Sequence, residues 1–198
     1  ITSSNLNRLV GGTLADVRAK RLKVVIAKRN IQKLHKDAVV VDHAKKWEYV
    51  HEDLIGCDLI VGCVDKFCVR RDIENFCRRH MIPYLDVGMD VKRLPSERYE
   101  IYGQIILSMP NEPCMKCMGF LTEQVLSEEA RDYGDAGDKP QVVWSNGVLC
   151  SAAAGVVVDL FTDWSKTFRQ PIYRTFRGSE LLLERDKRFS CDQKIQCC

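Results

Sequence analysis

The sequence lacks a long apolar run, a strong excess of one charge and a secretory leader. Its longest nearly uncharged apolar stretch, residues 147–158, has 12 residues, whereas a helix that spans a bilayer needs about 20. Lys and Arg number 30 against 27 Asp and Glu, and a net charge of +3 is too small for a protein whose main partner is a phosphate backbone. Residues 1–8 have neither a basic start nor an apolar core. We therefore expect no membrane segment, no bulk nucleic-acid binding and no export signal.

The cysteine content is also too low for a disulfide scaffold. Ten cysteines occur in 198 residues, and most stand singly in apolar or helical stretches. This distribution is typical of the reducing cytoplasm, where we expect the protein to reside. The composition is that of an ordinary globular chain, long enough for one sizeable core, so we expect a single domain over residues 1–198.

Short apolar strands alternate with helices in the first half of the chain. Residues 38–41 and 59–63 are β-branched, uncharged runs typical of strands buried on both faces. Residues 69–80 carry apolar side chains at helical spacing, and residues 84–87 form the next expected strand. Strand, helix and strand in succession indicate right-handed crossovers. The sequence therefore predicts a doubly wound, Rossmann-like α/β fold with a mostly parallel sheet.

The second half follows a different pattern, with antiparallel strands expected toward the carboxyl end. Residues 101–109 indicate a long strand, and residues 110–142 an irregular excursion that contains a C-x-x-C and a weakly ordered crossover loop. Residues 145–164 form the most apolar helix, which belongs in the core or at a subunit interface. Residues 171–176 and 181–184 predict a hairpin.

Four polar residues stand out by position: Asn5, Arg8, Lys20 and Asp65. Asp65 lies just beyond the strand at 59–63, and open parallel sheets bind ligands at the carboxyl ends of their strands, where a carboxylate can hold Mg²⁺. Arg8 precedes an amphipathic helix expected over residues 13–29, and Lys20 lies on it, so both can approach one phosphate. Arg8 offers a bidentate fork, Lys20 a point charge and Asn5 an amide. We predict that they offset the charge of a triphosphate under attack at one phosphorus.

Each of these residues also has a purely structural interpretation. Lys20 lies four residues after Asp16, the spacing of a helix-surface ion pair worth about 0.2–0.5 kcal/mol. Arg8 and Lys20, taken singly, are more often surface charges than phosphate ligands. An aspartate such as Asp65, after a buried strand, can simply cap the following turn or helix.

The order of the motifs resembles that of the ThiF/MoeB/HesA family of adenylating enzymes, which includes the adenylation domains of ubiquitin-activating enzymes. The matching segments are SNLNRL at 4–9, a helix with Lys20, DLIVGCVDKFCVRRDIENFC at 58–77, IPYLDVGMD at 82–90 and PCMKC at 113–117. The resemblance implies an ATP-dependent adenylyltransferase. Such an enzyme uses MgATP to adenylate the carboxyl-terminal glycine of a ubiquitin-like or sulfur-carrier protein, giving an acyl-adenylate and pyrophosphate.

Carried over by motif, Asn5 and Arg8 would contact the ATP phosphates, Lys20 would stabilise the phosphorus under attack, and Asp65 would engage Mg²⁺ and the reacting phosphate. The family's glycine-rich loop, ribose-binding acid and trans-acting arginine lie upstream of SNLNR, and none is in this sequence. Gly11-Gly12 follows no strand and lacks the G-x-G-x-x-G spacing. We therefore expect a fragment without its first strand, loop and helix, which does not bind ATP tightly as it stands.

Two other functions compete with this interpretation. The missing loop also suits a non-catalytic, partner-binding half of a heterodimeric activating enzyme. A nicotinamide-linked oxidoreductase shares only the fold, which by itself does not assign a function.

Cys114 and Cys117 form a C-x-x-C, the spacing of half a tetrahedral zinc site. A redox pair is the rival interpretation, but redox pairs usually stand where a strand leads into a helix. The resemblance puts the other half at Cys191 with Cys197 or Cys198, because Cys191 follows Cys117 by 74 positions, similar to the gap between the family's two pairs. The spacing of Cys191 and Cys197 departs from C-x-x-C, and a metal-free chain end is the alternative. The expected Zn²⁺ is structural.

Some family members transfer the activated partner to a cysteine in the crossover loop. No cysteine occurs between Cys117 and Cys150, and Cys150 lies in an Ala/Val-rich helix where a buried, inert thiol is expected. We therefore predict adenylation without a covalent cysteine step. The apolar helix at 145–164 and the habit of the family both predict a homodimer.

Overall fold

The computed structural model describes residues 1–95, 97–131, 143–162, 164–165 and 172–189. They form two units. Residues 1–55 make up the first, and the described residues from Gly56 onward, except Val143, make up the second. Each unit is described below by itself.

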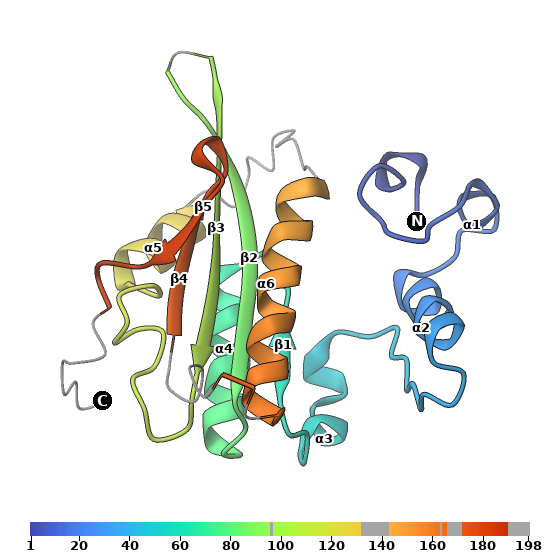
Figure 1. Ribbon diagram of the computed structural model, residues 1–198, viewed down its shortest axis with the longest axis horizontal. Helices are drawn as coiled ribbons and strands as arrows, with labels where there is room; N and C mark the ends of the chain where they lie inside the picture. The colour runs from blue at the N-terminus through green and yellow to red at the C-terminus, as the bar shows by residue number, and fades with distance from the viewer. Residues whose placement is uncertain (96, 132–142, 163, 166–171, 190–198) are drawn as a thin grey trace. The chain divides into compact units, whose positions relative to one another are not determined.

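The first unit is helical (Figure 1). Its elements are η1 (Ser3–Asn5), α1 (Leu14–Arg18), α2 (Lys23–Leu34), η2 (Trp47–Tyr49) and α3 (His51–Leu54). Thr13 and Asp16 begin α1 with a reciprocal capping box: Asp16 N donates to Thr13 Oγ1 at 3.2 Å, and Thr13 N donates to the Asp16 carboxylate at 2.9 Å. Ile26 of α2 is buried and anchors this helix.

The single helix predicted over residues 13–29 is wrong, because the chain breaks between Arg18 and Lys23. Lys20 has a φ of +48°, a left-handed conformation that ends a helix. Buried Asp16 then accepts hydrogen bonds from Arg29 Nη1 and Nη2 at 2.7 and 2.8 Å, which ties α1 to α2. Lys20 therefore lies in an exposed turn, and Asp16 is paired with Arg29 rather than with Lys20.

The strand predicted at residues 38–41 is also wrong. Val39 and Val41 are 94% and 73% exposed, and the described part of the first unit contains no strand that could pair with them. A run of β-branched residues forms a strand only where a neighbouring strand accepts and donates backbone hydrogen bonds with it. The preference of β-branched residues for strands is therefore not enough to form a strand at residues 38–41.

The second unit is built on one five-stranded sheet. Its strands are β1 (Ile60–Gly62), β2 (Tyr84–Arg93), β3 (Tyr99–Ser108), β4 (Ile172–Arg177) and β5 (Leu182–Arg185). Their spatial order is β1-β2-β3-β4-β5, and only β1 and β2 are parallel. The fold is α/β as predicted, but the mostly parallel sheet is wrong.

The reason lies in the connections. The parallel pair, β1 and β2, is joined through the crossover helix α4 (Phe67–Arg79). A few residues join β2 to β3, and the short η3 (Gly178–Glu180) joins β4 to β5, so both pairs must be antiparallel. The β4–β5 pair confirms the predicted carboxyl-terminal hairpin. The antiparallel strands thus begin earlier in the chain than expected.

Helices cover both faces of the sheet, with α4 on one side and α6 (Val143–Thr162) on the other (Figure 1). Side chains alternate accordingly along β2: Leu85 and Val87 join a core with α6, whereas Tyr84 and Asp86 face α4. The core on the α6 side consists of Leu85, Val87, Ile105, Leu107, Leu149, Ala153, Val156 and Phe176. A short helix, α5 (Glu123–Arg131), lies within the segment that was expected to be irregular.

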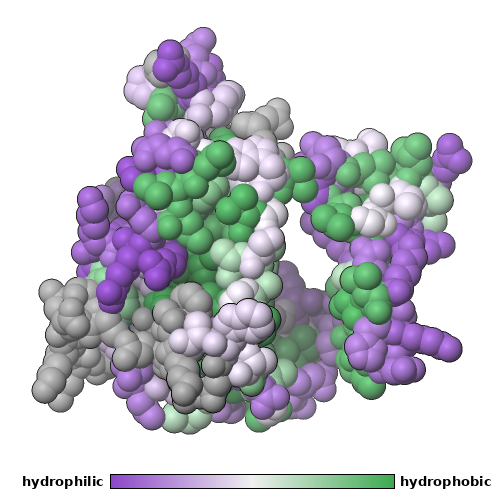
Figure 2. All heavy atoms as spheres, viewed as in Figure 1, coloured by the Kyte–Doolittle hydropathy of each residue, from purple (hydrophilic) through white to green (hydrophobic). Residues whose placement is uncertain are grey.

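By length and composition, α6 is the one described helix that could cross a membrane. Its Leu149, Ala153 and Val156 nevertheless pack on the sheet, as a core helix does. Much of its remaining surface is apolar and exposed, including Val148, Val158 and Phe161. Figure 2 shows hydrophobic side chains at the surface on this side of the second unit. Cys150 is exposed as well, so the expectation that this thiol is buried is wrong.

Candidate functional site

Asp65 lies where the sequence predicted it, at the carboxyl end of parallel strand β1. It is exposed and lies two residues before α4 begins at Phe67. The part of the chain that the structure describes forms no hydrogen bond or ion pair with its side chain. An exposed carboxylate at this end of a parallel strand is a suitable ligand for a divalent cation.

The capping role considered for Asp65 is filled by another carboxylate. Glu129 of α5 accepts hydrogen bonds from Phe67 N at 2.7 Å and Cys68 N at 2.9 Å, the first amides of α4. A carboxylate is favourable at this end of a helix, where the helix dipole is positive. Because Glu129 satisfies these amides, the carboxylate of Asp65 is not needed as a cap.

The buried side chain of Arg70 holds the loop that carries Asp65 through a hydrogen bond to the backbone. This guanidinium is almost completely buried and donates from Nη1 to Asp86 Oδ2 and from Nη2 to the carbonyl oxygen of Val64. Asp86 is fully buried, and burial raises the pKa of its carboxyl, while the charge of Arg70 acts in the opposite direction. Since both oxygens of Asp86 accept hydrogen bonds, we assign the pair as ionised.

The other predicted phosphate ligands belong to the first unit. Asn5 and Arg8 share one turn, since Arg8 N donates to Asn5 O at 3.1 Å. The Asn5 Oδ1 accepts a hydrogen bond from Thr2 N at 2.9 Å, and Arg8 Nη1 donates to Ser4 O at 3.1 Å. Both side chains are thus held against this turn. Lys20 lies in the exposed turn between α1 and α2.

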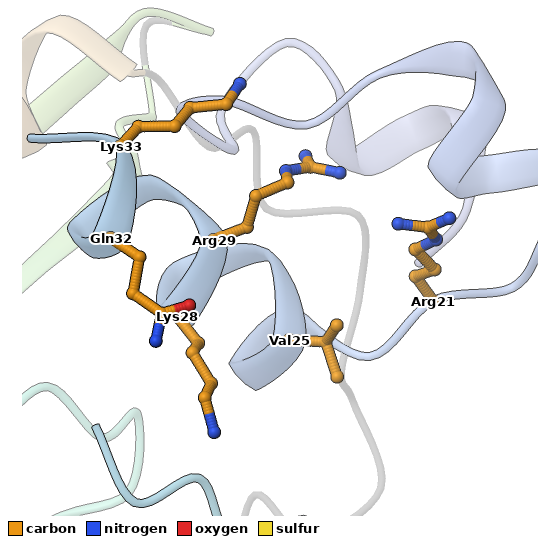
Figure 3. Close-up of a pocket in the computed structure, with 6 residues that line it drawn as sticks. All are labelled: Arg21, Val25, Lys28, Arg29, Gln32 and Lys33. Carbon is orange, nitrogen blue, oxygen red and sulfur yellow. The ribbon is translucent and has the colours of Figure 1, made fainter. Parts of the chain in front are cut away.

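The structure therefore brings Asn5 and Arg8 together and places Lys20 in the same unit, whereas Asp65 belongs to the other unit. The convergence of all four side chains on one triphosphate remains a prediction. A cavity of about 470 Å³ in the first unit is lined by Arg21, Val25, Lys28, Arg29, Gln32 and Lys33 (Figure 3). None of the four predicted residues lines it. Its cations are partly neutralised, because Arg29 pairs with Asp16 and Lys28 with Asp42.

Cys114 and Cys117 are arranged as half of a metal site would require. Their Sγ atoms lie 3.5 Å apart, too far for a disulfide of about 2.05 Å and close to the roughly 3.8 Å that two ligands at about 2.3 Å from a tetrahedral zinc would have. Buried Glu74 positions this turn by accepting hydrogen bonds from Met115 N at 2.8 Å and Ser108 Oγ at 2.5 Å. Burial raises the pKa of Glu74.

The other predicted zinc ligands, Cys191 with Cys197 or Cys198, lie outside the described residues. Within the residues that are described, no three His, Cys, Asp or Glu side chains gather into a metal-binding group. The zinc site therefore stays a prediction, and the Cys114 turn fits one half of it.

Arg70, Asp86 and Glu129 were not identified from the sequence as contributors to this site. Two signals could have identified the first two. Arg70 shares the apolar face of its helix with Ile73 and Cys77, and Asp86 interrupts a buried strand. A charge on each buried face indicates an ion pair between them. Glu129 gives no such signal, since it lies 62 residues from Phe67 in a segment without a clear pattern.

The chain belongs to the ThiF family, whose sequence model matches residues 1–194. Members of this family are ATP-dependent adenylyltransferases. This assignment confirms the resemblance noted from the motifs. Among curated proteins, none matches the sequence.

Solved structures similar to this chain include MccB of E. coli with ATP, with a TM-score of 0.72 at 16% identity over 100% of this chain and 56% of that chain. The microcin C7 biosynthetic enzyme MccB in complex with N-formylated MccA gives 0.69 at 16% identity, over 94% and 54%. PaaA gives 0.59 at 17% identity, over 96% and 62%. At these identities the likeness shows the fold alone. The chain spans little more than half the length of the MccB chains that it matches.

Proposed function

We propose that the protein is an ATP-dependent adenylyltransferase that activates the carboxyl-terminal carboxylate of a small protein or peptide. One observation carries this proposal within the ThiF family. Asp65 lies exposed at the carboxyl end of parallel strand β1, while Glu129 performs the capping that would otherwise occupy it. An available carboxylate at this position suits Mg²⁺ beside a nucleotide phosphate.

The other residues receive complementary roles. Arg8 and Asn5 bind phosphate oxygens from their shared turn, and Lys20 offsets charge at the phosphorus under attack. ATP with Mg²⁺ supplies the adenylyl group. The acceptor that we propose is a ubiquitin-like or sulfur-carrier protein ending in glycine. The MccB structures with MccA support a polypeptide as the acceptor in this fold.

ATP–pyrophosphate exchange in the full-length protein tests this function. With a candidate carrier present, we expect exchange that Asp65→Ala lowers by about 10²-fold or more, as for other groups that stabilise transition-state charge. Asp72→Ala is the matched control, because Asp72 is an exposed carboxylate on α4 that pairs with its neighbour Arg71. Equal exchange in wild type and Asp65→Ala would refute the role of Asp65.

The competing function is a non-catalytic, partner-binding half of a heterodimeric activating enzyme, which would share the ThiF fold. Isothermal titration of the full-length protein with MgATP separates the two. Heat of binding supports the adenylyltransferase, and its absence in a folded sample supports the scaffold.

A structural Zn²⁺ and a homodimer complete the proposal. The Sγ–Sγ distance of 3.5 Å at Cys114 and Cys117 supports the zinc, and the exposed apolar surface of α6 supports a subunit contact. One zinc per chain by metal analysis, lost in Cys114→Ser, is the expected result for the first. Light scattering tests the second, and a monomer at all concentrations would contradict it.

A further inference from the structure

A single buried side chain links the loop of Asp65 to the centre of the sheet. Arg70 lies on the first turns of α4 and is 5% exposed. Its Nη1 donates to Asp86 on β2, and its Nη2 donates to the carbonyl of Val64, the residue before Asp65. Because β1 ends at Gly62, this carbonyl lies beyond the strand, and Arg70 provides it with a donor from inside the protein.

The carboxylate that holds Arg70 is itself fixed from both sides. Tyr84 Oη donates to Asp86 Oδ1 at 3.1 Å, and Gln104 Nε2 donates to Asp86 Oδ2 at 3.0 Å. A fully buried carboxylate with donors on both oxygens has one orientation. The guanidinium of Arg70 is thereby anchored to two strands, β2 and β3.

The backbone leaves room for this network at two glycines. A Cβ atom at Gly88 would lie 2.3 Å from Gln104 Nε2 and 2.5 Å from Arg70 Nη2. A Cβ atom at Gly62 would lie 2.0 Å from Tyr84 Oη. All three distances are below 3.0 Å, so side chains at these positions would displace the network.

Stability alone is a weak reason for such an arrangement. Replacing a buried ion pair with apolar groups of similar volume is often neutral or even stabilising, because both charges lose their hydration on folding. What an apolar pair cannot reproduce is the hydrogen bond from Arg70 to the Val64 carbonyl. The distinctive effect of the network is therefore on the backbone of the loop.

We propose that Arg70, anchored by Asp86, is a positioning residue for Asp65. Its hydrogen bond to Val64 fixes the start of the loop, so that the carboxylate of Asp65 meets the metal–nucleotide without reorganisation. This inference rests on the role proposed above for Asp65.

The decisive variant is the double substitution Arg70→Met with Asp86→Leu, which fills the volume with apolar atoms and removes the donor to Val64. Arg71→Met is the matched control, since Arg71 is the exposed neighbour that pairs with Asp72. We expect the double variant to fold with a thermal midpoint lowered by several degrees, because Tyr84 Oη and Gln104 Nε2 lose their acceptor on Asp86. In the full-length protein, hydrogen–deuterium exchange of peptides covering residues 63–68 should become at least about tenfold faster, and the β2–β3 peptides should be unchanged.

A second readout is kinetic. In ATP–pyrophosphate exchange we expect the double variant to lower kcat by about tenfold or more, with little change in KM for ATP, because positioning acts in the transition state. Arg70→Lys, which keeps the charge with a single donor group, should recover part of the loss. If the double variant is unstable, Arg70→Lys carries both measurements, with an intermediate increase in loop exchange expected.

The outcomes separate this inference from the proposed function. If wild type and Asp65→Ala show the same exchange activity, the proposed function fails, and positioning of a catalytic Asp65 fails with it. If Asp65→Ala is inactive but the folded double variant matches wild type in kcat and in loop exchange, only the positioning role is refuted. Faster loop exchange together with a lower kcat supports it.

Discussion

The carboxylate of Glu129 is predicted to be the main stabilising contact at the start of α4. It accepts hydrogen bonds from Phe67 N and Cys68 N at 2.7 and 2.9 Å in a partly buried setting. Loss of a helix cap costs about 0.5–2 kcal/mol, and loss of a negative charge at this end adds about 0.3–1 kcal/mol. For Glu129→Ala we therefore expect about 2 kcal/mol of destabilisation, or a fall of roughly 4–8 °C in Tm for a protein of this size.

Glu129→Gln keeps an acceptor oxygen but loses the charge, so its cost should be about half as large. Glu128→Ala is the control. Glu128 is exposed on the same helix, where it accepts a hydrogen bond from the side chain of Gln124. Urea unfolding followed by far-ultraviolet circular dichroism measures all three variants. If Glu129→Ala and Glu128→Ala are equally stable, the capping argument is refuted, and with it the reason for regarding Asp65 as available.

Three further predictions concern separate parts of the chain. Lys20 has a φ of +48°, so Lys20→Gly should leave the stability of the protein unchanged or raise it by up to about 1 kcal/mol. If the Lys20 side chain binds the ATP phosphates, the same variant should abolish pyrophosphate exchange. Undiminished exchange in Lys20→Gly, with a loss in Lys23→Ala, would assign that role to Lys23. The hydrogen bonds from Arg29 lower the pKa of Asp16, so this carboxylate contributes stability above its unfolded pKa of about 4 and loses it as pH falls further; unfolding measured from pH 7 to pH 2 should show a smaller acid loss in Asp16→Asn. Burial raises the pKa of the Cys77 thiol to about 12, so iodoacetamide should label Cys77 only after denaturation, and labelling of the native protein would contradict the assigned packing.

The sequence was most informative where a local pattern and its surroundings agree. The sequence predicted four features of the second unit: helix α4, strands β2 and β3, and the β4–β5 hairpin. In each of them the spacing of the apolar residues matches the face that the element buries. Asp65 was found for the same reason, since a polar residue after a buried strand marks an end of the sheet.

Prediction failed where the outcome depends on residues far away in the chain. The run at residues 38–41 has the composition of a strand but no partner in its unit, so it stays exposed. The break at Lys20 follows from the tertiary pairing of Asp16 with Arg29, which no helical period shows. The direction of β3 relative to β2 depends on a connection of only a few residues, whereas the alternation earlier in the chain favoured a crossover.

The unequal pairing of the strands has a consequence for how the molecule opens. The β2–β3 ladder pairs ten residues on each strand, and a short connection joins the two strands. Strand β1 forms only three pairs, all with β2, and the chain between these two strands includes helix α4. Closing the short connection between β2 and β3 costs little conformational entropy, whereas closing the longer connection between β1 and β2 costs more. Folding should therefore start at the hairpin and finish at β1, and on gentle warming β1 should be the first strand to detach. The chain thus places the exposed carboxylate of Asp65 beside the strand with the fewest pairs, where a bound nucleotide would stabilise the molecule most against local opening.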